Sequence, residues 1–502
     1  MTGPETTPPV CITAGLVTGC REDGLNVFRG IPFARPPVGP LRFQAPQPAE
    51  AWAGPRPADR FGAPPPQPQG RAVSAPPGAG DPDEWLTINV WSPGLGAARL
   101  PVMVWIYGGA YVAGAASAPG YDGAALASQG VVLVSFNYRL GMEGFAQLTG
   151  APANRGLLDQ VAALRWVRDN IAAFGGDPGQ VTVFGESAGA GSVVSLLAMP
   201  AAAGLFQRAI AQSVPGTFFA AGLAADLAAA AARHFGKPPD ASALADIAPQ
   251  QLVEAGQSVL ASFGARASRD RWGAVAHTLT PFSPVVDGEV LPTAPWEALA
   301  RGGGRDVELI IGHNRDECRL FTVGNDLADA ETTSALAAFS PQPAGPTAYR
   351  RAFPAADGNR LYELAYSDWL FRMPAVHLAD AHAQAGGTTY LYELTYPAPG
   401  AGGALGACHG LDVPLVFGTP QADFGAMMLG DQVPGSAIAV GNTMRADWTA
   451  FAAGRPPAGW PRYHPPERLT RVYDDPVTDQ AYPEETSRRL WAEHRFAALP
   501  LL

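Results

Sequence analysis

A short glycine-rich turn around Ser187 constrains this chain more than any other segment. Residues 185–189 read Gly-Glu-Ser-Ala-Gly, and Phe184 connects them to the apolar run at 181–183. The two glycines let the backbone turn sharply, so that the serine hydroxyl stands clear of the sheet. A strand that enters such a turn and leaves it as a helix presents an exposed, reactive hydroxyl. The strain of the turn makes sense if that hydroxyl is used in chemistry.

The pattern on its own does not settle the role of Ser187. A chain with 58 glycines in 502 residues contains Gly-x-Ser-x-Gly by chance about 0.3 times. Ser187 is the only serine in the sequence with glycine both two residues before it and two residues after it. Its role therefore depends on the partners that the rest of the chain supplies.

Composition indicates a large enzyme and argues against one class of partner. The chain is 47% hydrophobic and includes 58 glycines and 50 prolines, which predicts a large core with many turns and surface loops. Charged residues make up only 16%, the net charge is −11, and no long basic block occurs. We therefore expect no nucleic-acid partner.

Targeting and cysteine signals predict a soluble cytoplasmic protein without a membrane partner. The first residues lack a basic segment followed by an apolar core, which a secretory signal would need. No stretch approaches the roughly 18 uninterrupted apolar residues of a membrane span. The four cysteines are too few for a disulfide scaffold, and none forms the Cys-x-x-Cys pair of a structural zinc site.

Apolar runs that alternate with helical patterns predict an α/β fold. Strands are expected at residues 102–107, 131–137, 181–184, 208–213, 307–312 and 388–393. Several of these runs are continuously apolar, which suits strands that are covered on both faces, and residues 157–174 and 220–235 read as helices between them. This alternation predicts a large, mostly parallel sheet with helices on both faces. The Pro- and Gly-rich stretches at 64–80, 341–346 and 397–407 read as loops inside one domain, 1–502.

A second glycine turn ends another predicted strand. Residues 104–111 read Val-Trp-Ile-Tyr-Gly-Gly-Ala-Tyr. Such a turn can be a tight connection and nothing more. Its functional reading is an oxyanion hole, in which backbone N–H groups of this loop and of the residue after Ser187 converge on a developing negative charge. Glycine suits that role because a Cβ would obstruct the substrate.

These segments, together with several others in the same order, resemble the type-B carboxylesterases, a family that includes cholinesterases and bacterial para-nitrobenzyl-type esterases. The matching motifs are Phe-Arg-Gly-Ile-Pro-Phe-Ala at 28–34, Pro-Pro-Val-Gly-Pro-Leu-Arg-Phe at 36–43, Leu-Thr-Ile-Asn-Val-Trp at 86–91, Asn-Tyr-Arg-Leu-Gly at 137–141, Gly-Leu-Leu-Asp-Gln at 156–160, Pro-Val-Val-Asp-Gly at 284–288 and Trp-Thr-Ala-Phe-Ala at 448–452. The resemblance, closest to the bacterial members, implies an α/β-hydrolase fold with loop and helix insertions over the active site. It places oxyanion donors at Gly109, Ala110 and Ala188.

The resemblance also implies the acid and the base that would act with Ser187. It points to Glu317, within Gly-His-Asn-Arg-Asp-Glu at 312–317, and to His409, within Cys-His-Gly at 408–410. The chain order Ser, Glu, His is the order of α/β-hydrolases. His313 is the main rival base among eight histidines, but it precedes Glu317 and would invert that order. Asp316 is the rival acid.

Other matches imply supporting roles. Glu186 is expected near the site without belonging to the triad, and Ser213 is expected to form a hydrogen bond close to it. The family also implies ion pairs that hold loops around the core, here Arg139 with Asp159 and Arg42 with Asp83. Candidate pocket walls, each of which could equally belong to an ordinary core, are Phe218, Phe219, Trp369 and Phe371.

Two departures from the family narrow the expectation. The family's Glu-Asp-Cys-Leu segment reads Asp-Glu-Trp-Leu at 83–86, so the cysteine that closes the early loop is missing. The loop at 64–80 contains no aromatic residue that could stack on a quaternary ammonium group, so we do not expect a cholinesterase.

The expected function is hydrolysis of a small-molecule carboxylic ester through an acyl-enzyme on Ser187. This chemistry requires no metal and no organic cofactor. The same triad could instead cleave lactones, thioesters or amides, or transfer acyl groups in a biosynthetic pathway. A non-catalytic binding protein on this fold is a further alternative. The oligomeric state stays open.

Overall fold

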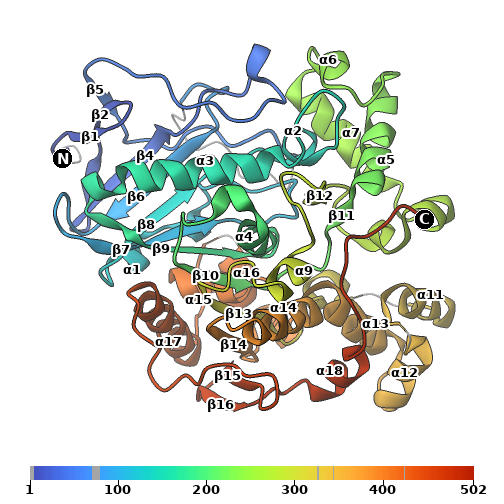
Figure 1. Cartoon of the computed structure of the whole chain (residues 1–502). Helices are drawn as coiled ribbons and strands as arrows, with labels where there is room; N and C mark the ends of the chain where they lie inside the picture. Colours follow the sequence, from blue (N-terminus) through green and yellow to red (C-terminus); the bar gives the residue numbers. More distant parts are fainter. Residues whose placement is uncertain (1–4, 70–79, 325–326, 343, 423) are drawn as a thin grey trace.

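A large mixed sheet forms the centre of the computed structural model, which describes residues 5–69, 80–324, 327–342, 344–422 and 424–502 (Figure 1). Most of the early loop at 64–80 thus lies outside the described residues. In spatial order, the eleven strands of the sheet in the described residues are β16 (Thr478–Ala481), β15 (Leu469–Tyr473), β14 (Thr389–Leu394), β13 (Glu308–Asn314), β10 (Arg208–Gln212), β9 (Gly176–Glu186), β7 (Leu100–Ile106), β8 (Val132–Phe136), β6 (Thr87–Ser92), β4 (Leu25–Pro32) and β3 (Cys20–Glu22).

The middle of this sheet is parallel and its two edges are antiparallel. Every neighbouring pair from β8 through β7, β9, β10, β13 and β14 to β15 is parallel, whereas β16, β6, β4 and β3 pair antiparallel. All residues of β8 are buried, as expected for a parallel strand that helices cover on both faces. Two smaller sheets contain β1 (Val10–Ile12), β2 (Gly15–Thr18) and β5 (Pro55–Pro57), and β11 (Phe219–Ala220) with β12 (Val285–Val286).

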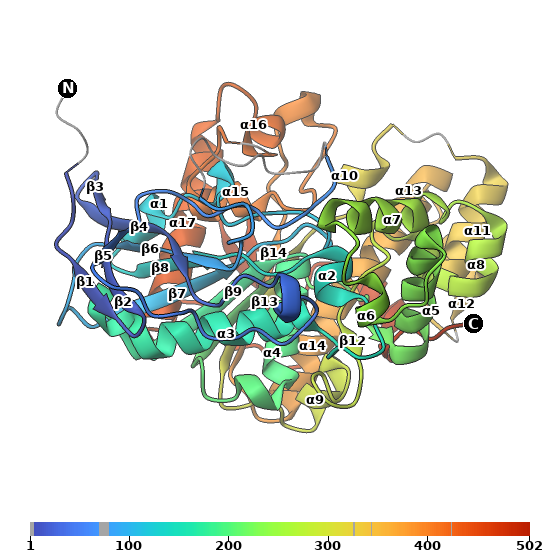
Figure 2. The same ribbon diagram turned by 90° about the horizontal axis from the view of Figure 1, so that it is seen from above.

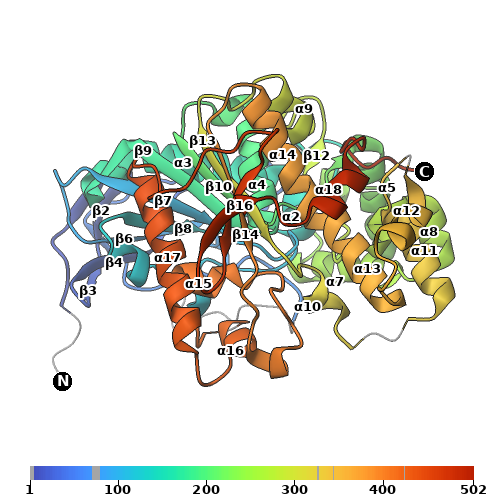
Figure 3. The ribbon, with the colours of Figure 1, turned by 90° about the horizontal axis from the view of Figure 1, so that it is seen from below.

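Helices cover both faces of the sheet (Figures 2 and 3). On one face lie α3 (Arg155–Asn170), α4 (Ala188–Ala198), α9 (Pro295–Ala300) and α14 (Met373–Gln384). On the other lie α1 (Ala124–Ala127), α15 (Asp412–Phe417) and α17 (Gly435–Ala452), with α16 (Phe424–Leu429) beyond them. Among the described residues, no helix combines the length and the apolar character that crossing a membrane demands.

The remaining helices extend the molecule beyond one end of the layered core. They are α2 (Gly141–Phe145), α5 (Ala221–Ala232), α6 (Ala241–Leu244), α7 (Pro249–Ala261), α8 (Arg266–Trp272), α10 (Arg319–Thr322), α11 (Asp329–Phe339), α12 (Gly345–Ala352), α13 (Gly358–Ser367) and α18 (Glu485–Trp491). Most of them belong to the two long insertions, one between β11 and β13 and one between β13 and β14, and they gather at the same end of the sheet (Figure 2).

The fold class predicted from the sequence is confirmed, and the differences concern boundaries and strands that were not predicted. The helix predicted at 157–174 begins earlier, at Arg155, and its last turn is a 3₁₀-helix, Ile171–Phe174. Strand β9 is longer than the apolar run at 181–184, because its first residues also pair with β7. Five strands of the sheet within the described residues were not predicted, namely β3, β4, β6, β15 and β16; all residues of β16 are exposed, whereas those of β6 are all buried.

One of the two expected ion pairs is confirmed and the other is wrong. Arg139 Nη2 lies 2.7 Å from Asp159 Oδ1, and both side chains are buried. Arg42 does not pair with Asp83; its Nη2 lies 2.6 Å from Glu143 Oε1 on α2, and another nitrogen donates to the Ala245 carbonyl. The contact with α2 supplies Arg42 with a buried carboxylate, which the exposed Asp83 side chain does not offer.

Candidate active site

The turn around Ser187 has the geometry of a nucleophile elbow. β9 ends at Glu186, α4 begins at Ala188, and Ser187 between them has φ 56° and ψ −123°, a conformation that costs a non-glycine residue free energy. A Cβ on Gly189 would lie 2.0 Å from the carbonyl oxygen of Ile106. The elbow is therefore pressed against the end of β7, and only glycine permits that approach.

The glycine turn after β7 passes directly alongside the elbow. A Cβ on Gly108 would lie 2.8 Å from the Glu186 carboxylate and 3.1 Å from the Ser187 Cβ. The next two residues are held at positive φ, 111° at Gly109 and 57° at Ala110. Within the part of the chain that the structure describes, neither of their N–H groups donates to a protein acceptor.

Ala188 contributes the third N–H group predicted for an oxyanion hole. As the first residue of α4, it has no acceptor within the helix for its N–H, and the helix N-terminus favours negative charge nearby. Free donors from the loop after β7 and from a helix N-terminus thus lie on either side of Ser187.

Glu317 and His409 form a short hydrogen bond although 92 residues separate them in the chain. His409 Nδ1 lies 2.6 Å from Glu317 Oε2. The other carboxylate oxygen accepts hydrogen bonds from Ser213 Oγ at 2.6 Å and from the Asn314 backbone N–H at 2.8 Å. Glu317 is completely buried, so its charge depends on these donors and on the imidazole. The hydrogen bond predicted for Ser213 close to the triad is present, and its acceptor is Glu317.

The second nitrogen of His409 contacts Glu186. Its Nε2 lies 3.1 Å from Glu186 Oε1. That oxygen lacks a hydrogen-bond partner in the described residues, so the contact has the distance of an ion pair without hydrogen-bond geometry. Across the same residues, no hydrogen bond joins Ser187 to His409. Catalytic hydrogen bonds often form only when substrate is bound, so this geometry leaves the Ser187–His409 pairing possible.

The buried carboxylates around His409 control where its proton resides. Burial, together with the charges of Asp412 and Glu317, raises the pKa of Glu186 to about 8, although the His409 charge opposes the shift. For His409, burial lowers the pKa, but the charges of Glu186 and Glu317 outweigh it and raise it to about 9. These two shifts describe one shared proton. When Glu186 holds it, the negative charge beside Nε2 disappears and His409 can remain neutral.

Two aromatic rings pack against the His409 imidazole. The Phe371 ring is stacked on it at 4.1 Å between centroids and 24° between planes, and the Phe321 ring lies tilted at 5.6 Å. Phe371 belongs to a π-helical turn, Asp368–Arg372, a feature that often re-aims a side chain toward a functional site. The other aromatic residues considered for pocket walls are buried, namely Phe218, Phe219 and Trp369.

The rival residues are engaged elsewhere. His313 is fully buried, its Nε2 lies 2.9 Å from the Tyr482 hydroxyl, and burial next to Arg372 lowers its pKa to about 3. The Asp316 carboxylate contacts arginine side chains. Within the described residues, no group of three or more His, Cys, Asp or Glu side chains could hold a metal ion.

The sequence analysis missed Asp412 and Phe321. Asp412 is buried, accepts hydrogen bonds from Gln212 Nε2 at 2.7 Å and from the Tyr392 hydroxyl at 3.0 Å, and adds negative charge near His409. Asp412 follows His409 by three residues, and Phe321 follows Glu317 by four. These spacings were signals in the sequence, because they return side chains to the same side of a helical turn.

Comparisons with known proteins identify the family of the chain. A model of the carboxylesterase family matches residues 6–488. The para-nitrobenzyl esterase of Bacillus subtilis is 36% identical over 95% of this chain and 96% of its own, and the fumonisin B1 esterase of Sphingopyxis macrogoltabida is 37% identical over 90% and 83%.

Solved structures give the same result. A para-nitrobenzyl esterase superposes with a TM-score of 0.84 at 34% identity, covering 96% of this chain and 99% of the other. A carboxylesterase of Geobacillus stearothermophilus has a TM-score of 0.83 at 33% identity, covering 97% and 100%. The chain therefore has the α/β-hydrolase fold, belongs to the carboxylesterase family and is a serine hydrolase of carboxylic esters.

Proposed function

We propose that Ser187 is the nucleophile of this esterase, with His409 as its general base and Glu317 as the acid that orients the base. The observation that carries the assignment is the 2.6 Å contact between Glu317 Oε2 and His409 Nδ1 beside the strained Ser187 elbow. A carboxylate at Nδ1 fixes the tautomer that leaves Nε2 free to accept a proton, and it stabilises the imidazolium that results.

Glu186 is proposed to control the protonation state of His409. A protonated Glu186 carries no charge, so it does not draw a proton onto Nε2, which lies 3.1 Å away. In that state Nε2 can turn toward the Ser187 hydroxyl and accept its proton as the hydroxyl attacks the ester carbonyl. The pKa of Glu186, about 8, lies within about one unit of that of His409, about 9, so the state in which Glu186 holds the proton is accessible as the minor partner of the state in which His409 holds it.

The backbone N–H groups of Gly109, Ala110 and Ala188 are proposed to hold the oxyanion. The absence of protein acceptors for the first two leaves them available to a substrate in the described structure. Loss of one such donor typically lowers the rate about 10²–10³-fold. The alcohol leaves with the proton from His409, and a water that His409 activates then releases the acid from Ser187.

The substrate is proposed to be a small-molecule ester. The names of the relatives mention para-nitrobenzyl esters, fumonisin B1 and phenmedipham, and each name describes that relative alone. The rings of Phe371 and Phe321 beside His409 favour an ester with an apolar group. Lactones, thioesters, amides and acyl transfer to another acceptor use the same chemistry, and a substrate panel distinguishes them.

We further propose that residues 1–502 form one domain in a bacterial cytoplasmic enzyme. Strands of the same sheet come from residues 20–22 and from 478–481, which supports a single unit. The four cysteines are free, as is common for proteins in a reducing compartment. Bacterial relatives are 34–37% identical, whereas the mammalian ones are 33–34% identical.

Hydrolysis of para-nitrophenyl esters tests the proposal. The wild-type enzyme and Ser187→Ala are assayed on acyl chains from two to twelve carbons. We expect turnover by the wild type and a loss of about 10⁴-fold or more in kcat in the variant, because the nucleophile is gone. Wild-type turnover that survives in Ser187→Ala would overturn the assignment. A folded wild type that binds these esters without turnover would favour a non-catalytic protein.

A further inference from the structure

The loop that carries Glu317 and the loop that carries His409 are joined at Asp316. Its backbone N–H donates to the Ala407 carbonyl at 2.9 Å, and its carboxylate accepts the Ala407 N–H at 3.1 Å. Gly406 permits this approach, because a Cβ there would lie 2.6 Å from the Asp316 carboxylate. Asp316, one residue before Glu317, thus makes two hydrogen bonds to Ala407, which lies two residues before His409.

Hydrogen bonds on both sides of Asp316 complete the connection between the two loops. The Asn314 side-chain amide donates to the Cys408 carbonyl at 2.7 Å, and the His409 backbone N–H donates to the Glu317 carbonyl at 3.1 Å. Besides the Glu317 carboxylate, which contacts His409 Nδ1, the Asp316 carboxylate is the only charged group in these cross-loop bonds within the described residues.

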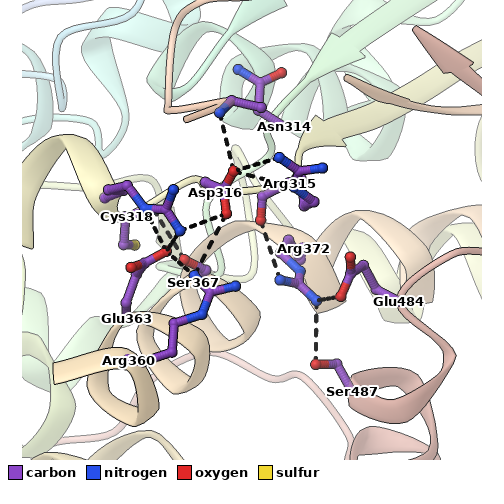
Figure 4. Close-up of polar contacts among 12 residues, drawn as sticks. Asn314, Arg315, Asp316, Cys318, Arg360, Glu363, Ser367, Arg372, Glu484 and Ser487 are labelled. Carbon is purple, nitrogen blue, oxygen red and sulfur yellow. Dashed lines mark hydrogen bonds and ion pairs between the residues drawn. The ribbon is translucent and has the colours of Figure 1, made fainter. Parts of the chain in front are cut away.

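Three arginines, Arg315, Arg319 and Arg360, surround the Asp316 carboxylate, and Figure 4 labels the first and the last of them. The carboxylate oxygens lie 3.1 Å from Arg315 Nη2, 2.9 Å from Arg319 Nη2 and 3.5 Å from Arg360 Nη1. Only 2% of the residue is exposed. Burial alone would raise the pKa of Asp316, but the charges of Arg315 and Arg319 and the Ala407 hydrogen bond outweigh it and lower the pKa. The carboxylate is therefore charged at neutral pH.

The arginines connect the triad loops to an insertion. Arg319 opens α10 and Arg360 lies in α13, both in the segment between β13 and β14. These two guanidinium groups also share Glu363 on α13. The cluster thus contains three positive and two negative groups. Without the Asp316 charge, three guanidinium groups would face one carboxylate, and their repulsion would push the acid-bearing loop away from α13.

We propose that Asp316 is a positioning residue that holds Glu317 and His409 in register by binding the base-bearing loop and the three arginines at once. The inference rests on the proposed function of Ser187, Glu317 and His409. A displacement of about 1 Å in a catalytic group can lower the rate about 10²-fold. Asp316 makes no contact with the reacting atoms in this account and acts through the Glu317–His409 hydrogen bond.

The variant Asp316→Asn tests the inference. The amide keeps the size of the side chain and can still accept the Ala407 N–H, so the substitution removes mainly the charge. On a para-nitrophenyl ester we expect kcat to fall about 10- to 100-fold, while KM changes less than about threefold, because positioning and not ground-state binding is lost.

The acid limb of the kcat/KM profile gives a second readout. The carboxylates that face His409 are Glu186 on β9, Glu317 in its own loop and Asp412 on α15. A looser Glu317 stabilises the His409 imidazolium less, so the limb should move to lower pH in Asp316→Asn. A loss of stability alone would lower the active fraction without moving this limb.

Glu485→Gln is the matched control. Glu485 on α18 also binds two arginines, Arg488 and Arg489, but it lies at the surface and has no contact with the triad loops. We expect wild-type kcat and an unmoved acid limb. If Asp316→Asn does not fold, the variant Arg360→Met provides the test, because the Arg360 side chain is partly exposed and its replacement should leave the fold intact. A decrease in kcat of about threefold or more, with the same shift of the acid limb, supports the proposal.

Two outcomes contradict the inference. One is a folded Asp316→Asn enzyme with wild-type kcat and pH profile, and the other is the same result in Arg360→Met where the first variant fails to fold. Covalent labelling with a fluorophosphonate, in parallel with Ser187→Ala, separates this failure from failure of the proposed function. If the wild type shows no Ser187-dependent labelling or turnover, the triad assignment itself is wrong.

Discussion

The elbow at Ser187 and the paired loops that carry Glu317 and His409 both hold a site residue in a fixed position, but by different kinds of contact. The elbow holds Ser187 by backbone geometry, with a strained φ of 56° and glycines pressed against β7. The paired loops hold Glu317 and His409 by side-chain charge and by hydrogen bonds between segments that lie far apart in the chain. Steric contacts hold the proposed nucleophile, whereas electrostatic contacts hold its proposed partners.

This difference predicts how each region responds to substitution. The elbow should tolerate almost no added volume, because the contacts around it are backbone atoms that cannot turn away. The paired loops should tolerate changes of shape better than changes of charge, and their failures should appear in the pH profile. Three substitutions examine the contrast, beginning with the largest expected effect.

Gly189→Ala should abolish activity. The added Cβ would lie 2.0 Å from the Ile106 carbonyl oxygen, and neither backbone can move without breaking the pairing of β7 with β9. We expect no folded enzyme, or a folded one with kcat reduced at least about 10²-fold. Circular dichroism and the ester assay measure the two outcomes.

Gly222→Ala is the control for this substitution. Gly222 is also the second residue of a helix, α5, and a Cβ there meets nothing within 4 Å. Alanine should stabilise this helix by about 0.5–1 kcal/mol with unchanged kcat. Full activity in Gly189→Ala would show that the elbow is not held by close contact.

Glu317→Gln should lower kcat about 10³–10⁴-fold with little change in KM. The amide keeps the volume but removes the charge that supports the His409 imidazolium, and it can present an N–H to Nδ1 and so favour the wrong tautomer. Stopped assays at several ester concentrations separate kcat from KM. Glu297→Gln, at an exposed position on α9, should behave as the wild type. A loss below about tenfold would remove Glu317 from the triad.

Glu186→Gln should shift the pH dependence and change the maximal rate less than about tenfold. Activity needs neutral His409, so kcat/KM rises as pH increases through the pKa of that group. The Glu186 charge raises this pKa, and glutamine does not. The acid limb should therefore move to lower pH, by about one unit. A limb that stays in place or moves upward would show that Glu186 does not control the proton on His409.

The part of the site that depends on local sequence could be predicted, and the rest could not. The elbow and the glycine turn are contiguous motifs, and six of the parallel strands are contiguous apolar runs, so these were recognised without knowledge of the fold, whereas the parallel strand β15 was not. Glu317 and His409 followed from a family resemblance together with chain order, because no local pattern links residues 92 positions apart.

The predictions of ion pairs failed where the fold brings together charged residues that lie far apart in the sequence. The partner of Arg42 is Glu143, about a hundred residues away, and the expected Asp83 is exposed. Asp316 entered the sequence analysis only as a rival to Glu317, because its arginines are brought together by α10 and α13. β16 lacked an apolar pattern because its residues are exposed, whereas β4 and β6 are largely buried and were not recognised either.

The most direct test of the account is to find the acyl group on the enzyme. The wild type is mixed with a para-nitrophenyl ester, quenched during the first turnover in acid, digested, and mapped by mass spectrometry. The account predicts one acyl group per chain, on the peptide that contains Ser187, and none in Ser187→Ala. An acyl group on another residue, or turnover without any acyl-enzyme at the earliest times, would contradict it.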